Sequence, residues 1–330
     1  MSEQPAFTRQ FIDLAQPRLG AAVIRASDDF FAAKERLIKP SEPVFIADKY
    51  DDNGKWMDGW ESRRMREAGN DYCIVQICAG TIHGFDIDTS FFTGNYPPKA
   101  SIDACCEQAH PGPNTVWEPL LGVVDLSADA HHYFAVDDSR VWTHVRLNIF
   151  PDGGVARLRV YGTAHRDWTG HAEDEWVDLA AMENGGRALA CNDMHFGHMC
   201  NLIAPGKAAN MGDGWETRRR RETGHDWVLL KLGHPGSVRK IELDTAWFKG
   251  NYPDSCALYG AYLTQTGDGE IDIDAPYWQE ILPQMKLGPD KLHTFIKNIN
   301  DSGPVTHVLL KIFPDGGVAR LRLLGPVYRK

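Results

Sequence analysis

Short segments in which apolar and polar residues alternate recur along the whole chain. Residues 85–88 place apolar and acidic side chains on opposite faces, and residues 241–244 repeat that pattern. Denser apolar runs at 72–78 and 227–232 are rich in residues that favour strands. Successive side chains of a strand point to opposite faces of a sheet, so this alternation indicates strands with one buried face. The pattern therefore predicts a protein built mainly from short strands.

Turn residues and two helical candidates complete this picture. Residues 144–150 alternate and stop at Pro151–Gly154, a strong turn signal, after which residues 155–160 alternate again. We expect these two strands to form a hairpin. Helices are predicted for 28–37 and for 129–134. Because no strand–helix–strand rhythm is present, the sequence favours a β-sandwich or jelly roll.

The sequence of the first half returns in the second half. Three long motifs occur twice in the same order, and the third is identical in both copies. These motif pairs are Asp58–Arg64 with Asp213–Arg219, Asp88–Pro97 with Asp244–Pro253, and Phe150–Arg159 with Phe313–Arg322. Two tandem copies of one domain explain this better than a short-period array. The predicted division is an N-terminal tail (1–10), repeat 1 (11–162), a linker (163–175) and repeat 2 (176–330).

Composition narrows the possible classes of protein. The chain has 330 residues and a net charge of −10, which argues against a general nucleic-acid binder. No apolar run approaches the roughly 18 residues of a membrane helix, and the first residues lack the features of a signal peptide. The seven cysteines include no Cys-x-x-Cys pair, which favours reduced thiols. We expect a cytoplasmic protein without membrane or nucleic-acid partners, assembled into a homo-oligomer through exposed sandwich faces.

The repeated motifs resemble those of the allantoicase family. The resemblance rests on Asp-Gly-Trp-Glu-[Ser/Thr]-Arg-Arg, Asp-Thr-x-x-Phe-x-Gly-Asn-Tyr-Pro and Phe-Pro-Asp-Gly-Gly-Val-Ala-Arg, each present twice, and it covers almost the whole chain. It implies an all-β fold of two tandem jelly-roll β-sandwich domains related to galactose-binding and discoidin-like domains. It also implies hydrolysis of allantoate to ureidoglycolate and urea, a step in purine (allantoin) degradation that recovers nitrogen.

The implied reaction needs acid–base groups and a carboxylate-binding group. Allantoate carries a carboxylate and two ureido groups on one carbon; the departing urea needs a proton, and the attacking water needs a base. The proton-transfer candidates are Glu61, Asp88, His132, Glu216, Asp244 and His293. A guanidinium fork fits a carboxylate, and an amide pairs with a urea group. The substrate-binding candidates are accordingly Arg63, Asn95, Arg157, Arg218, Asn251 and Arg320. We expect no cofactor and no metal.

Each candidate also has a structural interpretation. Arg63 and Arg64 occupy consecutive positions and, on a strand, point to opposite faces, so only one of them serves a given site. A Glu61 paired to a nearby arginine would simply fix the start of a strand. Residues 94–97 form a turn sequence in which Gly94 or Asn95 accepts positive φ. The sequence leaves open whether each repeat holds its own site or both repeats share one.

Two other interpretations stay open at the level of sequence. Tandem jelly rolls also occur as non-catalytic modules that bind carbohydrates or other ligands on loop tips. Tyr50, Asp51 and Trp56 offer such features in repeat 1, whereas the matching stretch 204–211 of repeat 2 lacks them. Repeat 2 is also rich in histidine, and these side chains would form a metal site only if they converged in space. They are His195, His198, His225 and His234.

Overall fold

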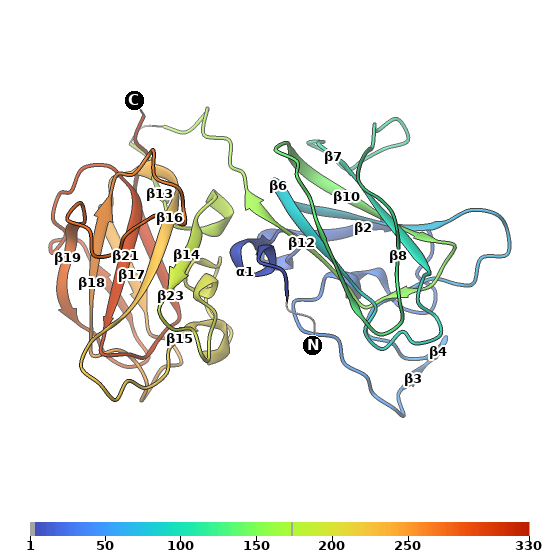
Figure 1. Cartoon of the computed structure of the whole chain (residues 1–330), viewed down its shortest axis with the longest axis horizontal. Coiled ribbons are helices and arrows are strands. Elements are labelled where there is room, and N and C mark those ends of the chain that lie inside the picture. Colours follow the sequence, from blue (N-terminus) through green and yellow to red (C-terminus); the bar gives the residue numbers. More distant parts are fainter. Residues whose placement is uncertain (1–3, 173, 330) are drawn as a thin grey trace. The chain divides into compact units, whose positions relative to one another are not determined.

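The structure is a computed structural model that describes residues 4–172 and 174–329 (Figure 1). It divides into two compact units, unit 1 (residues 1–165) and unit 2 (residues 166–330), each dominated by antiparallel strands. The repeats identified in the sequence lie one in each unit. In the described part of the chain, no helix is long and apolar enough to cross a membrane.

The described residues of unit 1 form one short α-helix, two 3-10 helices and a series of strands. In chain order these are α1 (Phe7–Gln10), β1 (Ile12–Asp13), η1 (Pro17–Leu19), β2 (Ala22–Ala26), η2 (Lys34–Ile38), β3 (Tyr50–Asp51), β4 (Gly54–Lys55), β5 (Trp60–Glu61), β6 (Asp71–Asp88), β7 (Lys99–Cys105), β8 (Glu118–Asp125), β9 (His131–Ala135), β10 (Val141–Phe150), β11 (Gly154–Val155) and β12 (Arg157–Ala164). Strand β12 thus extends into the segment that the sequence assigns to the linker.

Unit 2 repeats this order with 3-10 helices in its loops. Its elements are β13 (Trp176–Asp178), η3 (Met182–Asn184), β14 (Arg187–Cys191), η4 (Met199–Ile203), η5 (Met211–Asp213), β15 (Trp215–Glu216), β16 (Asp226–Gly236), β17 (Lys240–Asp244), β18 (Ser255–Ala261), β19 (Gln279–Lys286), β20 (Leu292–Phe295), β21 (Val305–Phe313), β22 (Gly317–Val318) and β23 (Arg320–Pro326).

Unit 2 shows the two layers of a sandwich most clearly. One sheet has the order β13-β23-β17-β20, and the other has the order β14-β16-β21-β18-β19 (Figure 1). In unit 1 the corresponding strands join a single sheet because β6 continues through both layers. Its first part pairs with β2 and β10, and its last part pairs with β12 and β9. Both units are therefore jelly-roll β-sandwiches, which confirms the fold class predicted from the sequence.

A buried tryptophan of the first motif anchors each unit. Trp60 and Trp215 are fully buried, and each indole Nε1 donates a hydrogen bond to a backbone carbonyl. The acceptors are the carbonyl oxygens of Asp28, at 2.8 Å, and Asp193, at 2.9 Å. A buried indole N–H without an acceptor would be costly, so these bonds tie the loop after β2 or β14 to the motif.

The hairpin predicted at Pro151–Gly154 is wrong. Strand β10 pairs with β6 and β7, whereas β12 pairs with β6 and β1, so β10 and β12 do not pair with each other. The short strand β11 instead pairs with β5, and this ladder carries the chain from one layer of the sandwich to the other. In unit 2, β22 pairs with β15 in the same way. A local turn signal does not determine which strand the departing segment joins.

The two predicted helices are also wrong. In residues 28–37 the helical part is confined to residues 34–37, which belong to the 3-10 helix η2. Earlier in this segment, Ala32 bridges to Glu61 and the carboxylate of Asp28 binds Arg63. In residues 129–134, residues 131–134 instead belong to strand β9, which pairs with the last part of β6. Partner strands supply hydrogen bonds that outweigh weak local helix signals.

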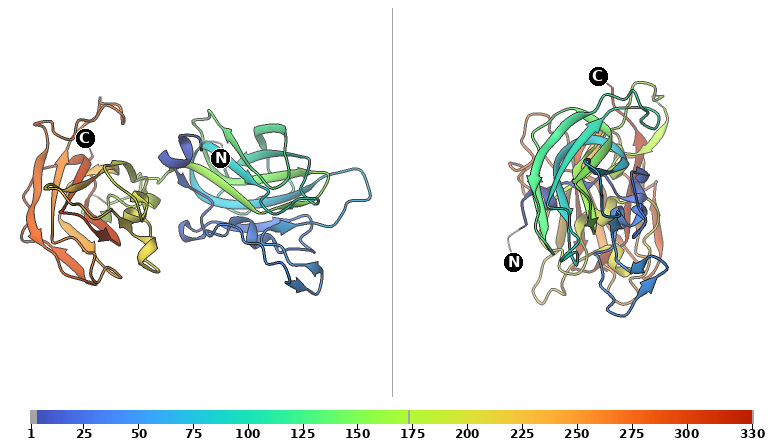
Figure 2. Two further views of the ribbon diagram at one scale, coloured as in Figure 1. Left: turned by 60° about the horizontal axis from the view of Figure 1, so that its bottom comes forward. Right: turned by 90° about the vertical axis from the view of Figure 1, so that its right-hand side faces the viewer.

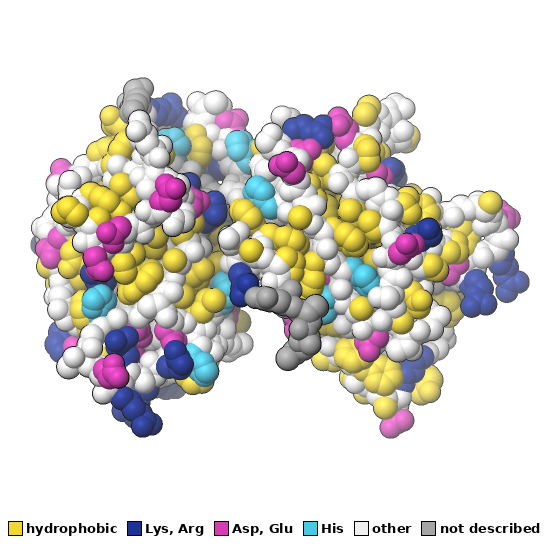
Figure 3. Space-filling view, viewed as in Figure 1, with side chains coloured by type: hydrophobic (Ala, Val, Ile, Leu, Met, Phe, Trp, Pro, Cys, Tyr) yellow, Lys and Arg dark blue, Asp and Glu magenta, His cyan; other side chains and the backbone are white. Residues whose placement is uncertain are grey.

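The surface mixes charge and exposed apolar side chains. Basic and acidic side chains are interspersed over the face shown in Figure 3. The small β3–β4 hairpin projects from the strands of unit 1 in Figures 1 and 2. Several large apolar side chains near this hairpin are exposed, namely Val44, Phe45, Ile46 and Tyr50.

Candidate functional site

A polar pocket of about 560 Å³ lies in unit 1 where the three repeated motifs meet. Its walls come from β5 with the residues that follow it, from the turn after β6, and from the crossover after β10. The lining residues are Phe31, Glu61, Ser62, Arg64, Met65, Gly94, Asn95, Tyr96, Pro98, Pro151, Asp152 and Gly153. Each of the three motifs therefore contributes side chains to one cavity.

Backbone contacts hold the walls of this pocket together. The amide of Gly154 donates to the carbonyl of Asn95 at 2.7 Å, and the amide of Ser62 donates to the carbonyl of Gly153 at 3.1 Å. Gly153 has a φ of 141°, and a Cβ at this position would lie 2.7 Å from the nitrogen of Pro97. Only glycine accepts both conditions. The Pro-Asp-Gly-Gly sequence thus serves the close packing of three segments.

Glu61 and Asn95 face each other in the pocket. The side-chain amide Nδ2 of Asn95 donates to Oε1 of Glu61 at 2.7 Å. Burial raises the pKa of the Glu61 carboxyl, the hydrogen bond from Asn95 opposes this rise, and the charge of Asp51 adds to it. A carboxyl with a raised pKa holds its proton closer to neutral pH and can therefore act as an acid as well as a base.

Unit 2 holds an equivalent pocket of about 450 Å³. Glu216 takes the place of Glu61, and it accepts a hydrogen bond from the side-chain amide of Asn251, which takes the place of Asn95. The remaining lining residues are Phe196, Thr217, Arg219, Gly250, Tyr252, Asp254, Pro314, Asp315 and Gly316. A carboxylate–amide pair beside an arginine is thus built twice in the chain.

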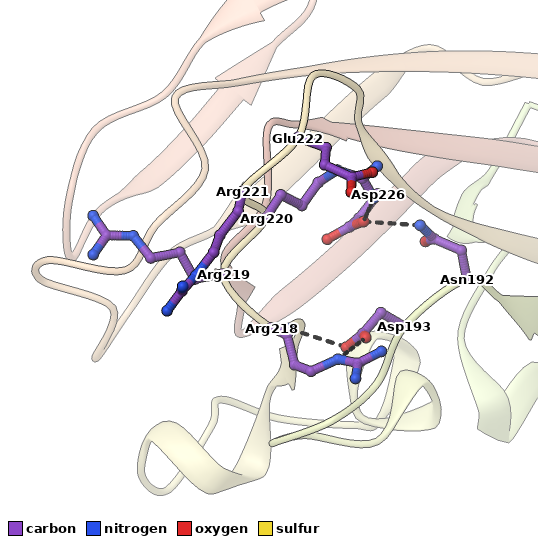
Figure 4. Close-up of a pocket in the computed structure, with 8 residues that line it drawn as sticks. All are labelled: Asn192, Asp193, Arg218, Arg219, Arg220, Arg221, Glu222 and Asp226. Atoms are coloured by element: carbon purple, nitrogen blue, oxygen red, sulfur yellow. Dashed lines mark hydrogen bonds and ion pairs between the residues drawn. The ribbon is translucent and has the colours of Figure 1, made fainter.

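The second arginine of each Arg-Arg pair lines these pockets, and the first does not. The guanidinium of Arg63 pairs with Asp28 at 2.6 Å, and Nε of Arg218 pairs with Asp193 at 2.7 Å. Figure 4 shows Arg218 directed at Asp193 in a neighbouring arginine-rich pocket, with Arg219 extending away from that pair. The arginine that lines each pocket is therefore Arg64 or Arg219, whereas the sequence-based prediction named Arg63 and Arg218.

Arg157 and Arg320 lie in buried networks away from these pockets. The Arg157 side chain is 1% exposed, and its Nη2 pairs with Asp58 at 2.7 Å. Nε of Arg157 donates to the carbonyl of Ser41 at 2.9 Å. Arg320 pairs in the same way with Asp213, at 2.8 Å. These contacts tie the loop before the first motif to the strand after the crossover, which is a structural role.

Asp88 and Asp244 also lie outside the two pockets. Asp88 ends β6 and accepts a hydrogen bond from the amide of Ser90 at 2.8 Å. Asp244 ends β17 and accepts one from the amide of Ala246 at 2.9 Å. Asp244 lines a separate small pocket together with Arg320. The structure therefore does not bring these carboxylates to Glu61 or Glu216.

The two candidate histidines hold turns in place. Nε2 of His132 accepts a hydrogen bond from the amide of Ser127 at 2.9 Å, and Nε2 of His293 accepts one from Gly288 at 2.8 Å. The other ring nitrogen of each histidine contacts a carbonyl of the neighbouring strand. With both nitrogens engaged, these imidazoles stabilise the entry into β9 and β20, away from the pockets.

The histidines of repeat 2 do not assemble a metal site. Among residues 4–172 and 174–329, the one cluster of three metal-ligating side chains lies in unit 1 and consists of Glu42, Asp88 and His131. Oxygen and imidazole ligands of this kind suit divalent transition metals. The sequence argument missed Glu42 and His131 because they lie outside the repeated motifs.

Other pocket residues were present in the motifs but assigned to turns. Asp152 accepts a hydrogen bond from the amide of Met65 at 2.7 Å, and it also lines the pocket of unit 1. Tyr96 and Tyr252 line the two pockets beside the asparagines. The sequence offered one indication of these residues, which is that they occur in both repeats. Residues that are needed only to form a turn in each repeat would recur in the same way.

The chain is similar to known proteins along nearly its whole length. A family described as "Allantoicase repeat" matches residues 12–165 and 177–328. A protein of Photobacterium profundum named "Probable allantoicase" is 54% identical over 318 residues, which cover 96% of each chain. A protein of the same name from Pseudomonas aeruginosa is 51% identical over 327 residues, covering 98% of each chain. The crystal structure of an allantoicase from Saccharomyces cerevisiae matches with a TM-score of 0.78 and 35% identity, over 96% of this chain and 94% of that one.

Proposed function

Because this chain belongs to the allantoicase family, we propose that it hydrolyses allantoate to ureidoglycolate and urea. The reaction belongs to purine degradation and recovers nitrogen from allantoin. The observation in the chain that carries this function is the polar pocket, which each repeat builds from the same three motifs. The similarity to allantoicases extends over both repeats, so it covers both pockets.

We propose that each repeat holds one complete site. Arg64 in unit 1 and Arg219 in unit 2 supply a guanidinium fork for the substrate carboxylate. Asn95 and Asn251 offer an amide that both donates to and accepts from a ureido group. No described residue of the other unit is needed to complete either set.

Glu61 and Glu216 are proposed to move the proton. Cleavage of the carbon–nitrogen bond expels urea, whose nitrogen must be protonated as it leaves, while water attacks the same carbon. Glu61 is half-buried, and the pKa of its carboxyl is raised by that burial, so it can deliver a proton near neutral pH. After the transfer, the carboxylate can accept a proton from the attacking water. The hydrogen bond from Asn95 keeps the carboxyl oriented during both steps.

We also propose that the protein works in the cytoplasm as a homo-oligomer. All seven cysteines are free thiols, which fits a reducing compartment. The exposed apolar side chains Val44, Phe45 and Ile46 offer a surface for a second copy. Size-exclusion chromatography with light scattering measures the assembly directly, and a monomer at micromolar concentration would contradict it.

Urea release from allantoate tests the proposed activity. Purified full-length protein in buffer supplemented with divalent metal salts is expected to release urea and ureidoglycolate in equal amounts. The metal salts ensure that the outcome does not depend on any metal lost in purification. Folded protein that binds allantoate without releasing urea would instead be a non-catalytic tandem jelly-roll ligand-binding protein.

A further inference from the structure

A second cluster of polar side chains lies in unit 1, outside the Glu61 pocket. One ligand atom from each of Glu42, Asp88 and His131 lies within 4.8 Å of the others. Asp88 on β6 and His131 on β9 are directly paired across the sheet. Glu42 comes from the loop after η2, and it is exposed, as is His131. The cluster therefore combines two ligands on rigid strands with one on an open loop.

A contact with Asp86 fixes the orientation of the His131 imidazole. Its Nδ1 contacts Oδ2 of Asp86 at 2.8 Å, which leaves Nε2 facing the cluster, 4.0 Å from Oδ1 of Asp88. A carboxylate that holds the far nitrogen of an imidazole is the usual outer support of a metal-binding histidine. Asp86 therefore stands where such a support belongs.

Among the residues that the structure describes, two carboxylate oxygens in this region have no hydrogen-bond partner. Asp88 is 1% exposed and its Oδ2 is unpaired, while Asp86 is 3% exposed and its Oδ1 is unpaired. A buried carboxylate oxygen without compensation is costly, and natural proteins pair such groups or use them to coordinate metals. These unpaired buried oxygens are a second observation, independent of the clustering, that points to a cation-binding role.

Unit 2 shows what the same place looks like without these ligands. Leu292 on β20 pairs with Asp244 across the sheet, where unit 1 has His131 beside Asp88. Arg157 and Arg320 bind the carbonyls of Ser41 and Gly206 in equivalent ways. This correspondence puts Lys207, which follows Gly206, in the place of Glu42.

The charges of unit 2 are balanced by side chains instead. Lys207 lines a small pocket with Glu242 and Asp244, and Lys240 pairs with Glu242 at 2.6 Å. Where unit 1 places His131 beside its buried carboxylates, unit 2 supplies lysines. The two repeats differ here in their chemistry although they share the same strands.

We propose that unit 1 binds one divalent transition-metal ion through His131, Asp88 and Glu42, and that unit 2 does not. One imidazole nitrogen and two carboxylate oxygens form a ligand set that suits Mn²⁺, Fe²⁺ or Zn²⁺. Ligands around one such ion lie at about 2.1 Å from it, so the exposed Glu42 loop moves slightly inward on binding. Water fills the remaining positions on the exposed side. The site lies apart from the Glu61 pocket and does not depend on the proposed reaction.

Titration of the metal-stripped full-length protein with Mn²⁺, followed by the electron paramagnetic resonance signal of the free ion, tests this site. We expect one Mn²⁺ bound per chain. Glu42→Gln changes an exposed residue and should leave the fold intact while weakening Mn²⁺ binding by at least about tenfold. His131→Leu, which copies the residue of unit 2, is expected to do the same. Lys207→Gln is the matched control in unit 2 and should leave the stoichiometry and affinity unchanged.

Two outcomes would overturn the proposal. The first is the absence of saturable Mn²⁺ binding, which would leave His131 as an ion-pair partner of Asp86 and Asp88. The second is stoichiometric binding that neither Glu42→Gln nor His131→Leu weakens. Circular dichroism of each variant separates loss of the site from loss of the fold.

Discussion

The two repeats keep one pocket and differ at another place on the same framework. Glu61 with Asn95, and Glu216 with Asn251, form the same carboxylate–amide pair. At the end of the neighbouring strand, unit 1 has His131 beside Asp88 and unit 2 has Leu292 beside Asp244. What both repeats keep is therefore either required by the fold or used in both units. A residue that differs between the repeats, such as His131 in unit 1, can have a role in one unit only.

Replacing the buried arginine that both repeats share is expected to have the largest effect, and the effect should be on stability. Arg157→Met leaves Asp58, which is 4% exposed, with Lys39 as its remaining ion-pair partner, and it removes a donor from several loop carbonyls. We expect the free energy of unfolding to fall by about 3–5 kcal/mol, as when one partner of a buried ion pair is removed. Urea unfolding followed by tryptophan fluorescence measures this.

The matched substitution in unit 2 is Arg320→Met, and it should destabilise the protein in the same way. A large rise in KM for allantoate at unchanged stability would contradict this interpretation. That result would instead support the sequence-based expectation that Arg157 and Arg320 hold the carboxylate of the substrate.

A buried histidine makes the stability of unit 2 depend on pH. Burial lowers the pKa of His307 to about 4, and the nearby cations Lys231 and Arg187 add to this while Asp268 opposes it. The unfolded chain binds the proton near pH 6.5, so stability is complete above pH 6.5 and falls as pH drops toward 4. The loss is expected to reach about 3 kcal/mol. Thermal unfolding between pH 7 and pH 4 measures it.

Unit 1 provides the comparison for this pH effect. His144 is the equivalent residue near the start of β10. Burial also lowers its pKa, and the neighbouring His110 adds to this decrease. His307→Gln should flatten the pH dependence of unfolding more than His144→Gln. Equal effects of the two substitutions would show that the cations around His307 do not matter.

The arginine pairs test which arginine of each pair faces the substrate. The double variant Arg64→Ala/Arg219→Ala should raise KM for allantoate by about 10- to 100-fold, because it removes a charge-assisted hydrogen bond from both pockets. Arg63→Ala/Arg218→Ala is the matched control. It breaks the exposed ion pairs with Asp28 and Asp193, which contribute less than about 1 kcal/mol each. A larger rise in KM for Arg63→Ala/Arg218→Ala than for Arg64→Ala/Arg219→Ala would instead indicate that Arg63 and Arg218 bind the substrate carboxylate.

Much of the fold follows from the sequence because strand alternation and internal repetition are visible in it. The jelly-roll class and the strands around residues 72–88 and 144–160 were predicted correctly. The crossover at Pro151–Gly154 was not, because a turn signal is local, whereas the partner of β11 lies about ninety residues earlier in the chain. The same limit explains β9, whose strand pairing overrides a weak helical signal.

Some residues of the candidate site could likewise be predicted from the sequence, and others could not. Glu61 and Asn95 were found because two repeated motifs contain them, and the structure brings them together. Sequence alone does not separate an arginine that faces a pocket from one, such as Arg157, that is buried against backbone carbonyls. Both types occur in motifs that the repeats share. Glu42 and His131 are outside those motifs, so only their proximity in the fold identifies them.

The central claim is that each repeat holds its own catalytic pocket. Its most direct test is to measure the steady-state kinetics of Glu61→Gln, Glu216→Gln and the double variant. Each single variant should retain about half of kcat with KM unchanged, because the other pocket still works. The double variant should lose activity by about 10²- to 10⁴-fold, the usual contribution of a general acid–base group. A single variant as inactive as the double variant would mean one site per chain. A double variant with full activity would exclude both glutamates from the reaction.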